Sequence, residues 1–239
     1  MAVVCLLGAN EHEEMREFYV VNSTAKSVRT DLALDLLKQS AESDPDVMEG
    51  LLARGEDWKV RGQTLVEAVE RHSTIWRGRI RFPGEPKGAT MITSSGMVTS
   101  VKPLLSTPYL GQLTTENQVK ILDAFWQGIR KDLPEVFEDP EGFVIQKMTG
   151  TLVMHTVLIH ALEYVRSKGW SVIEPESYAN TLADALGELQ GDTRDGAVVS
   201  GVDFWRAGAE GAAGSFSSNA GRRVLTAKIR AGLPEPEVE

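Results

Sequence analysis

Apolar residues recur along most of this chain at the three- and four-residue spacing of amphipathic helices. In residues 31–39, for example, Leu32, Leu36 and Leu37 are expected to share one face. Side chains suited to helix caps stand at several starts, such as Thr114 before a broad apolar stripe. The pattern predicts helices over residues 11–19, 31–39, 45–52, 58–69, 114–129, 152–165, 175–189 and 222–230.

Strand patterns are few. Short apolar runs at 3–7 and 89–92 predict strands, and residues 75–82 alternate between apolar and basic side chains. A period of two is typical of a half-buried strand, and it would send Arg77, Arg79 and Arg81 to one solvent-facing side. We therefore expect a helix-rich α/β or α+β fold.

Composition suggests how the chain divides. Glycine, alanine and serine are abundant over 208–221, which predicts a flexible loop, and the last residues predict a disordered tail. We expect a mixed α/β region over 1–110, a helical region over 111–232 and a tail over 233–239.

The chain has 239 residues, of which 42% are hydrophobic and 25% charged, as in ordinary globular proteins. Cys5 is the only cysteine, which excludes an internal disulfide and fits a reducing cytoplasm. No apolar run approaches the ~18 residues that cross a bilayer, so we expect no membrane association. Acidic residues follow the apolar start directly, which favours a strand there over a signal peptide.

Charge is unevenly distributed on a chain of net charge −9. Residues 31–70 carry ten acidic and four basic side chains, whereas residues 71–102 carry six basic side chains against Glu85 alone. A second basic group comprises Arg206, Arg222, Arg223, Lys228 and Arg230. Such islands form either ordinary solvated surface or a face that contacts phosphates.

Familiar catalytic motifs are absent. The sequence contains no phosphate-binding P-loop, dinucleotide fingerprint, nucleophile elbow or zinc-protease helix motif. His155 and His160 are five positions apart, which does not place metal ligands on one helical face, so we expect core or groove histidines and no metal or cofactor. Asp123 and Asp132 could form an acid–base pair, but solvated carboxylates explain them as well. The five tryptophans favour core positions.

Residues 22–28 form the most suggestive local sequence. Asn22, Ser23, Thr24 and Lys26 stand between two predicted helices, where backbone N–H groups at a helix start can hold a phosphate or carboxylate. A simple capping loop explains the same residues.

Several short segments follow one another in a recognisable order. Residues 18–28 resemble the pattern F-x-x-I-N-x-x-x-K-x-V, and residues 76–80 resemble the pattern W-x-G-x-I. They are followed by a helix that contains Phe125-Trp126 and by the Thr149-Gly150 pair before an apolar helix. Taken together, these segments resemble the later part of DGQHR-domain proteins. The motif Asp-Gly-Gln-His-Arg itself is missing, and Arg61-Gly62-Gln63 stands in the wrong place to replace it.

The resemblance implies an incomplete ParB/sulfiredoxin-like core continued by a helical region, as in a truncated or split gene product. It also implies a role linked to DNA modification, defence or mobile elements. We therefore expect a DNA-associated accessory or regulatory protein, whose phosphate-contact candidates are Asn22, Ser23, Thr24, Lys26, Arg77, Arg79 and Arg81. Two alternatives stay open. One is a ParB-like nucleotide hydrolase or nuclease, and the other is a non-catalytic module whose sheet edge pairs with a partner protein or a second copy.

Overall fold

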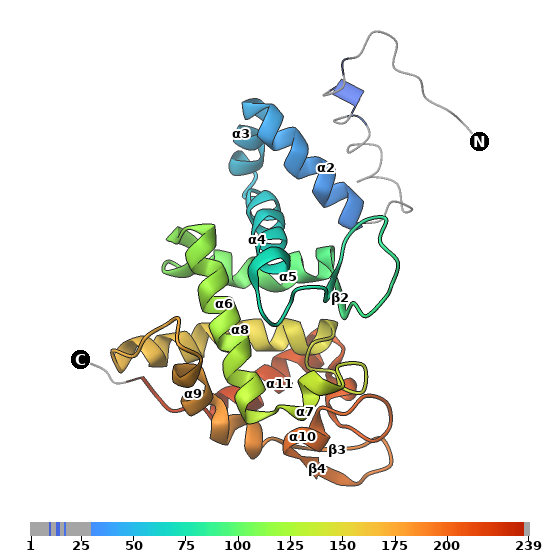
Figure 1. Ribbon diagram of the computed structural model, residues 1–239, viewed down its shortest axis with the longest axis vertical. Coiled ribbons are helices and arrows are strands. Elements are labelled where there is room, and N and C mark those ends of the chain that lie inside the picture. The colour runs from blue at the N-terminus through green and yellow to red at the C-terminus, as the bar shows by residue number, and fades with distance from the viewer. Residues whose placement is uncertain (1–9, 11–12, 15–16, 18–29, 237–239) are drawn as a thin grey trace.

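Helices dominate the computed structural model, which describes residues 10, 13–14, 17 and 30–236 (Figure 1). Of the residues that the structure describes, 63% are helical, and they include two small sheets of two strands each, which confirms the expected helix-rich mixed fold. The predicted strand at 3–7 and the loop at 22–28 lie outside the described residues, and so does most of the helix at 11–19.

The long helices are α2 (Thr30–Ser43), α3 (Pro45–Ala53), α4 (Trp58–His72), α5 (Ser94–Leu105), α6 (Thr115–Asp132), α8 (Met148–Ser167), α9 (Pro175–Gly187) and α11 (Asn219–Ala231). Short helical turns are η1 (Leu110–Gln112), α7 (Glu135–Glu138), α10 (Gly201–Phe204) and η2 (Ala213–Phe216). Strands β1 (Ile80–Arg81) and β2 (Ile92–Thr93) pair in parallel, and β3 (Gln190–Asp192) and β4 (Val198–Ser200) form an antiparallel hairpin.

Helix starts follow the capping chemistry of the sequence. The side chain of Thr114 accepts a hydrogen bond from the N–H of Asn117 at the start of α6, and Asp44 accepts one from Asp46 at the start of α3. Each bond satisfies an N–H group that has no partner inside its helix. Five predicted helices between residues 45 and 189 lie close to their expected positions, although the starts of α4, α8 and α9 have no side-chain cap bond.

An aromatic core lies where α6 crosses the molecule. Trp126 packs edge-on against Trp76 with ring centroids 4.9 Å apart, and Phe125 packs edge-on against Tyr178 at 5.6 Å. All four rings are fully buried. The backbones of α6 and α9 approach closely because Gly128 has no Cβ; one built there would lie 2.8 Å from the Cβ of Tyr178. The expected core positions of Trp76 and Trp126 are confirmed, and Trp205 is buried too, whereas Trp58 is only half-buried and Trp170 is exposed.

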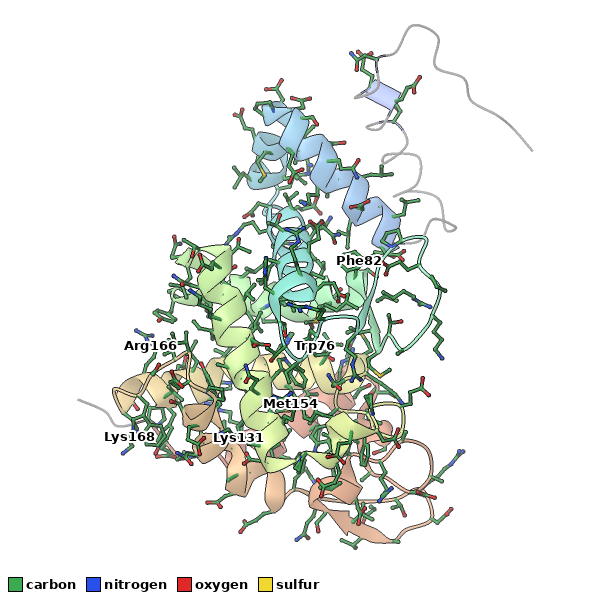
Figure 2. All side chains as sticks on the ribbon, in the orientation of Figure 1. Trp76, Phe82, Lys131, Met154, Arg166 and Lys168 are labelled. Carbon is green, nitrogen blue, oxygen red and sulfur yellow. The ribbon has the colours of Figure 1, made fainter. Side chains whose placement is uncertain are left out.

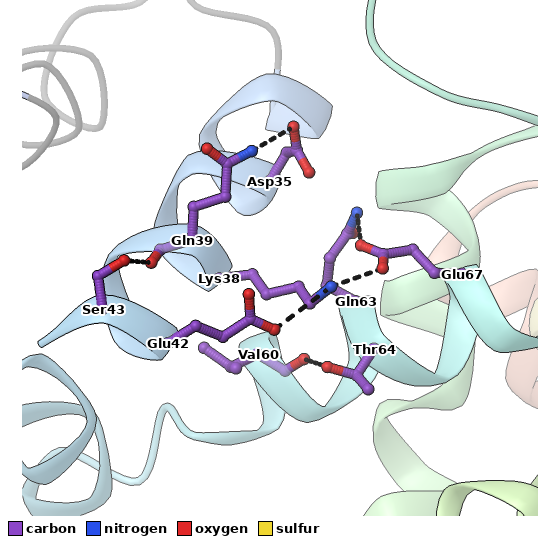
Figure 3. Close-up of polar contacts among 9 residues, drawn as sticks. All are labelled: Asp35, Lys38, Gln39, Glu42, Ser43, Val60, Gln63, Thr64 and Glu67. Carbon is purple, nitrogen blue, oxygen red and sulfur yellow. Dashed lines mark hydrogen bonds and ion pairs between the residues drawn. The ribbon is translucent and has the colours of Figure 1, made fainter. Parts of the chain in front are cut away.

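The helices α2 and α4 pack through a different, charged seam (Figure 3). Lys38 of α2 lies 2.5 Å from Glu67 of α4 and 3.5 Å from Glu42 of its own helix. The apolar cluster beside this seam is small: Leu37, Leu51 and Val60 form it, with partly buried neighbours. The buried stripe of α2 is Asp31, Leu34, Leu37 and Ser40, so the expected face of Leu32, Leu36 and Leu37 is wrong in part.

Two further expectations differ from the structure. The predicted strand over 75–82 is a turn that leads into β1, for reasons given below. The glycine-rich segment 208–221 is folded rather than open, since it contains η2 and buries Ala212 and Ala213 against the main core. The division near residue 110 remains a prediction, and the main apolar cluster includes Leu65 before it and Leu225 after it.

Candidate functional site

The basic stretch from Arg71 to Lys87, called the arginine segment below, joins the end of α4 to the loop before β2. Its cations are Arg71, Arg77, Arg79, Arg81 and Lys87. We describe first what fixes the backbone of this segment and then where its cations lie.

Ser73 folds the chain back directly after α4. Its hydroxyl oxygen accepts hydrogen bonds from the backbone N–H groups of Ile75 at 3.1 Å and Trp76 at 3.0 Å, and it donates to Asp123 of α6 at 2.5 Å. A serine that binds the backbone two and three residues ahead favours a turn over a strand. The turn carries Trp76 into the core, where it meets Trp126 (Figure 2).

Asp123 anchors this turn to α6. One carboxylate oxygen accepts hydrogen bonds from the hydroxyl of Ser73 and from the backbone N–H groups of Thr74 at 2.8 Å and Ile75 at 3.4 Å. The other accepts from the side-chain amide of Gln127 at 2.7 Å. Since both oxygens are engaged, Asp123 acts as a structural acceptor here.

Glu70, near the end of α4, holds the far side of the turn. Its carboxylate accepts hydrogen bonds from the N–H groups of Gly78 at 2.6 Å and Ile80 at 3.3 Å. Burial raises the pKa of Glu70, while these two N–H donors and the charge of Arg77 work against that rise. Gly78 has a φ of 74°, a conformation that glycine adopts without strain and that ends an extended strand. The alternation of apolar and basic residues predicted a strand here. The structure has a turn instead, stabilised by the carboxylates of Glu70 and Asp123.

The three candidate arginines do not share one strand. Arg77 lies in the turn and is exposed, whereas Arg79 and Arg81 are half-buried on either side of Ile80. Arg81 belongs to β1 and pairs in register with Thr93 of β2. Its Nε atom is buried and has no hydrogen-bond partner. Asn22, Ser23, Thr24 and Lys26 lie outside the described residues, so their position relative to these arginines stays a prediction.

No cation of the arginine segment pairs through its side chain with a carboxylate in the part of the chain that the structure describes. Elsewhere such pairs are common, as for Lys120 with Glu116 at 2.6 Å and Arg206 with Asp203 at 2.7 Å. The acidic side chains within reach are used otherwise: Glu70 holds the turn, and Glu85 accepts from the backbone N–H of Phe82 at 2.7 Å. Glu70 and Glu85 stay charged while they hold the backbone, and the charge of Arg77 acts on Glu70 from beyond ion-pair distance. With five cations against these two carboxylates, the segment keeps an excess of positive charge.

A groove of about 570 Å³ lies next to the turn, between α4 and α6. Its lining residues are Ala68, His72, Glu116, Val119, Lys120 and Asp123. Charges of both signs line it, and the Lys120–Glu116 pair neutralises part of them. It adds an accessible depression beside the arginine segment but no dominant charge of its own.

His155 has a structural role deep in the core. Trp126 donates its indole N–H to Nε2 of His155 at 3.0 Å, so that atom is an acceptor and Nδ1 carries the proton. Nδ1 lies 2.9 Å from the hydroxyl of Ser100, which donates to the carbonyl of Met97. Burial lowers the pKa of His155 to about 3, so the ring is neutral at physiological pH. This confirms the expectation of a satisfied core histidine.

The remaining candidates form no catalytic pair. His160 is half-buried and lies 3.7 Å from Glu163 on the same helix. Asp123 and Asp132 are nine positions apart on α6, about 13 Å along its axis, and do not meet. Among the described residues no group of three or more histidine, cysteine or acidic side chains is placed to hold a metal ion.

Sequence reasoning missed the two carboxylates that shape this site. Asp123 was considered only as an acid–base candidate, and Glu70 only as part of an acidic stretch. One local signal existed: the Ser73-Thr74 pair after a helix, followed by Gly78, is typical of a turn. The acceptor on α6, about fifty positions away, leaves no such signal.

Comparison with family models, curated proteins and solved structures finds no match to this chain. The resemblance to DGQHR-domain proteins therefore stays a prediction based on short motifs. Within the described residues, no helix combines the length and the apolar character required to cross a membrane.

Proposed function

We propose that this protein is a nucleic-acid-associated accessory protein that contacts backbone phosphates through the arginine segment. The observation that carries the proposal is the set of five cations, none in an ion pair with a carboxylate of the described residues, on and beside a turn fixed by Glu70 and Asp123. Arginine and lysine side chains bind phosphate by releasing the counterions that surround it, so unpaired cations on a fixed backbone suit this contact.

The net charge of −9 shapes the proposal. Most of the surface repels a polyanion, and binding is expected only where positive charge is concentrated. Such a protein contacts few phosphates and binds DNA without reading its sequence, because phosphate contacts position a protein while base contacts specify it. An accessory role beside a partner that recognises the sequence fits this pattern.

The test is the salt dependence of binding to a short duplex DNA, measured by fluorescence anisotropy. The logarithm of the affinity should fall linearly with the logarithm of the salt concentration, with a slope of about −0.9 per neutralised phosphate. Arg77→Ala should weaken binding and make the slope shallower by about one unit. Arg77 is exposed and makes no side-chain bond, so its replacement should leave the fold intact.

The matched control is Arg194→Ala. Arg194 is exposed in the β3–β4 hairpin, at the bottom of the molecule in Figure 1, and its replacement removes the same charge away from the arginine segment. We expect Arg194→Ala to bind DNA with the same salt dependence as the wild-type protein. Binding without a salt slope, or equal losses in both variants, contradicts it.

A further inference from the structure

Two helices begin at one corner of the molecule, beside the β1–β2 ladder. A Cβ built on Gly96, in the first turn of α5, would lie 3.0 Å from the sulfur of Met148, the first residue of α8. Further along, Ser100 of α5 bonds His155 of α8. The two helices therefore run side by side in the same direction, as Figure 1 shows, and their N-termini lie together.

The two helix N-termini make this corner electropositive. Each helix N-terminus presents backbone N–H groups that lack partners in their own helix, together with the positive end of the helix dipole. Neither α5 nor α8 has an acidic residue in its first turn. The N-cap position of α8 is Lys147, whose ammonium group bonds the carbonyl oxygen of Glu141 at 2.5 Å rather than a carboxylate. At the start of α5 the neutral side-chain oxygen of Thr93 accepts the N–H of Gly96, and no carboxylate of either first turn offsets the remaining positive charge.

Three buried side chains at the two helix starts have polar atoms without partners. The hydroxyl groups of Ser94 and Thr151 are fully buried and unbonded, and both polar atoms of the Gln146 amide are unbonded although the residue is only 1% exposed. Gln146 directly precedes the N-cap of α8 and Thr151 is its fourth residue, two positions whose side chains typically meet. Buried polar groups normally have a hydrogen-bond partner, because a buried group without one costs free energy.

Arg81 adds a full charge to the same corner. It stands opposite Thr93, the N-cap of α5, in the parallel ladder, and its buried Nε has no partner. A guanidinium group beside a helix start gives the combination of charge and fixed N–H donors that binds tetrahedral oxyanions in proteins.

We propose that the joint start of α5 and α8 is a binding site for a phosphate group. The N–H groups of the two first turns other than that of Gly96, the hydroxyl of Ser94, the amide of Gln146 and the guanidinium of Arg81 supply the donors. The site shares Arg81 with the arginine segment but does not include Arg77, so a change at Arg77 tests the two proposals separately. The phosphate group belongs either to a small phosphate ester or to a nucleic acid.

Calorimetric titration of the full chain with inorganic phosphate tests the site, at a constant ionic strength set with chloride. The wild-type protein should bind phosphate, and Ser94→Ala should weaken binding about tenfold because one donor to an anion is lost. Ser40→Ala is the matched control, since Ser40 of α2 is also buried with an unbonded hydroxyl but lies on a different helix. It should bind like the wild-type protein. No binding by the wild-type protein, or equal loss in both serine variants, overturns the proposal.

Arg81→Gln provides a second test that a folding defect cannot mimic. It should lose phosphate binding while its far-ultraviolet circular dichroism and melting temperature stay close to those of the wild-type protein. Arg77→Ala should keep phosphate binding even where it loses affinity for DNA, which separates the two proposals. Phosphate affinity unchanged in Arg81→Gln contradicts the site.

The source of the phosphate group is distinguished by competition. If inorganic phosphate displaces labelled duplex DNA from the protein at constant ionic strength, the site holds a nucleic-acid phosphate. If phosphate binds without displacing DNA, the site holds a small phosphate ester, and titration with a nucleoside monophosphate should show tighter binding than inorganic phosphate.

Discussion

Polar side chains are neutral where α5, α6 and α8 pack together, and charged where α2 packs on α4. At the centre, Trp126, His155 and Ser100 form a neutral hydrogen-bonded chain inside an aromatic and aliphatic core. At the α2–α4 seam, Lys38, Glu42 and Glu67 form a charged cluster that solvent still reaches; the Lys38 side chain is 15% exposed and that of Glu67 25%.

The difference shows what each contact depends on. The central chain has matched donors and acceptors and no charge, so its contribution is insensitive to salt. At the seam, burial opposes the charge of Lys38, but the bond and charge of Glu67 outweigh it and raise the pKa of that ammonium. Burial, followed by the charge of Glu67, raises the pKa of Asp35 nearby. We expect the core to resist changes of solvent and the seam to respond to them.

The largest effect is expected in the core. Trp126→Ala removes a fully buried indole, its edge-on contacts and the bond to His155, and should lower the free energy of unfolding by about 4 kcal/mol. Urea unfolding followed by circular dichroism measures it. Trp170→Ala is the control, because Trp170 is 39% exposed and packs mainly on Tyr164; it should cost less than about 1 kcal/mol. Similar losses in both variants would be inconsistent with a core centred on Trp126.

The next effect is the pH dependence that His155 imposes. Burial lowers its pKa to about 3 in the folded protein from the ordinary value of 6.5, so in this range the unfolded chain binds a proton that the folded protein excludes. Stability is therefore full above pH 6.5 and falls as the pH drops toward 3, by at most about 1.4 kcal/mol per pH unit. His155→Gln should show a shallower fall than the wild-type protein.

His160→Gln is the comparison for this pH experiment. Burial lowers the pKa of His160 as well, but the ring is only half-buried. Its replacement should therefore also make the fall of stability with decreasing pH shallower, but by less than His155→Gln does. Equal slopes for the wild-type protein and His155→Gln contradict a neutral, buried His155.

At the seam the effect should be smaller and depend on salt. Lys38→Met leaves Glu67, Glu42 and Asp35 close together and should cost roughly 1–2 kcal/mol at neutral pH. Adding Glu67→Met should recover part of that loss, because the two variants remove one interaction. High salt should reduce the cost of Lys38→Met by screening the carboxylates but leave the cost of Trp126→Ala unchanged. Additive, salt-independent costs would remove the distinction between seam and core.

The smallest effect is expected at Asp132, at the end of α6. Burial, followed by the charge of Glu176, raises its pKa to about 6 from 3.8. The cost in stability is absent below pH 3.8, grows as the pH rises from 3.8 to 6, and is complete above 6. Asp132→Asn should stabilise the protein at pH 7 by roughly 0.5 kcal/mol, since solvent screens a partly buried group. At pH 4 the substitution should leave the free energy of unfolding unchanged. Equal stabilisation at pH 4 and pH 7 would contradict a cause in the charge of Asp132.

Helices were predictable from sequence because their causes are local. The apolar stripe of α6 and its Thr114 cap lie within one segment, and so do the Asp44 cap and first proline of α3. The turn at 73–79 had a weak local signal in Ser73, Thr74 and Gly78, but the same residues alternate as a strand would. Its anchor, Asp123, lies on another helix and leaves no local signal. The helix α5 was missed because its start, Thr93-Ser94-Ser95-Gly96, carries no apolar residue.

The candidate site was predictable only in its charges. Arg77, Arg79 and Arg81 were identified as cations, but their lack of carboxylate partners follows from the use of Glu70 and Glu85 by backbone N–H groups. The phosphate site proposed at the start of α5 and α8 had no signal in the sequence. The burial of Ser94 and Gln146 results from two helices packing together, and single polar residues do not reveal their burial.

Hydrogen–deuterium exchange of the full chain, with and without saturating duplex DNA, tests the proposed role of the arginine segment most directly. Slower exchange with DNA is predicted in peptides covering residues 71–87, with unchanged exchange in α3 and the β3–β4 hairpin. Saturating binding that protects α3 or the hairpin and leaves residues 71–87 unchanged would contradict the assignment of the arginine segment as the functional face.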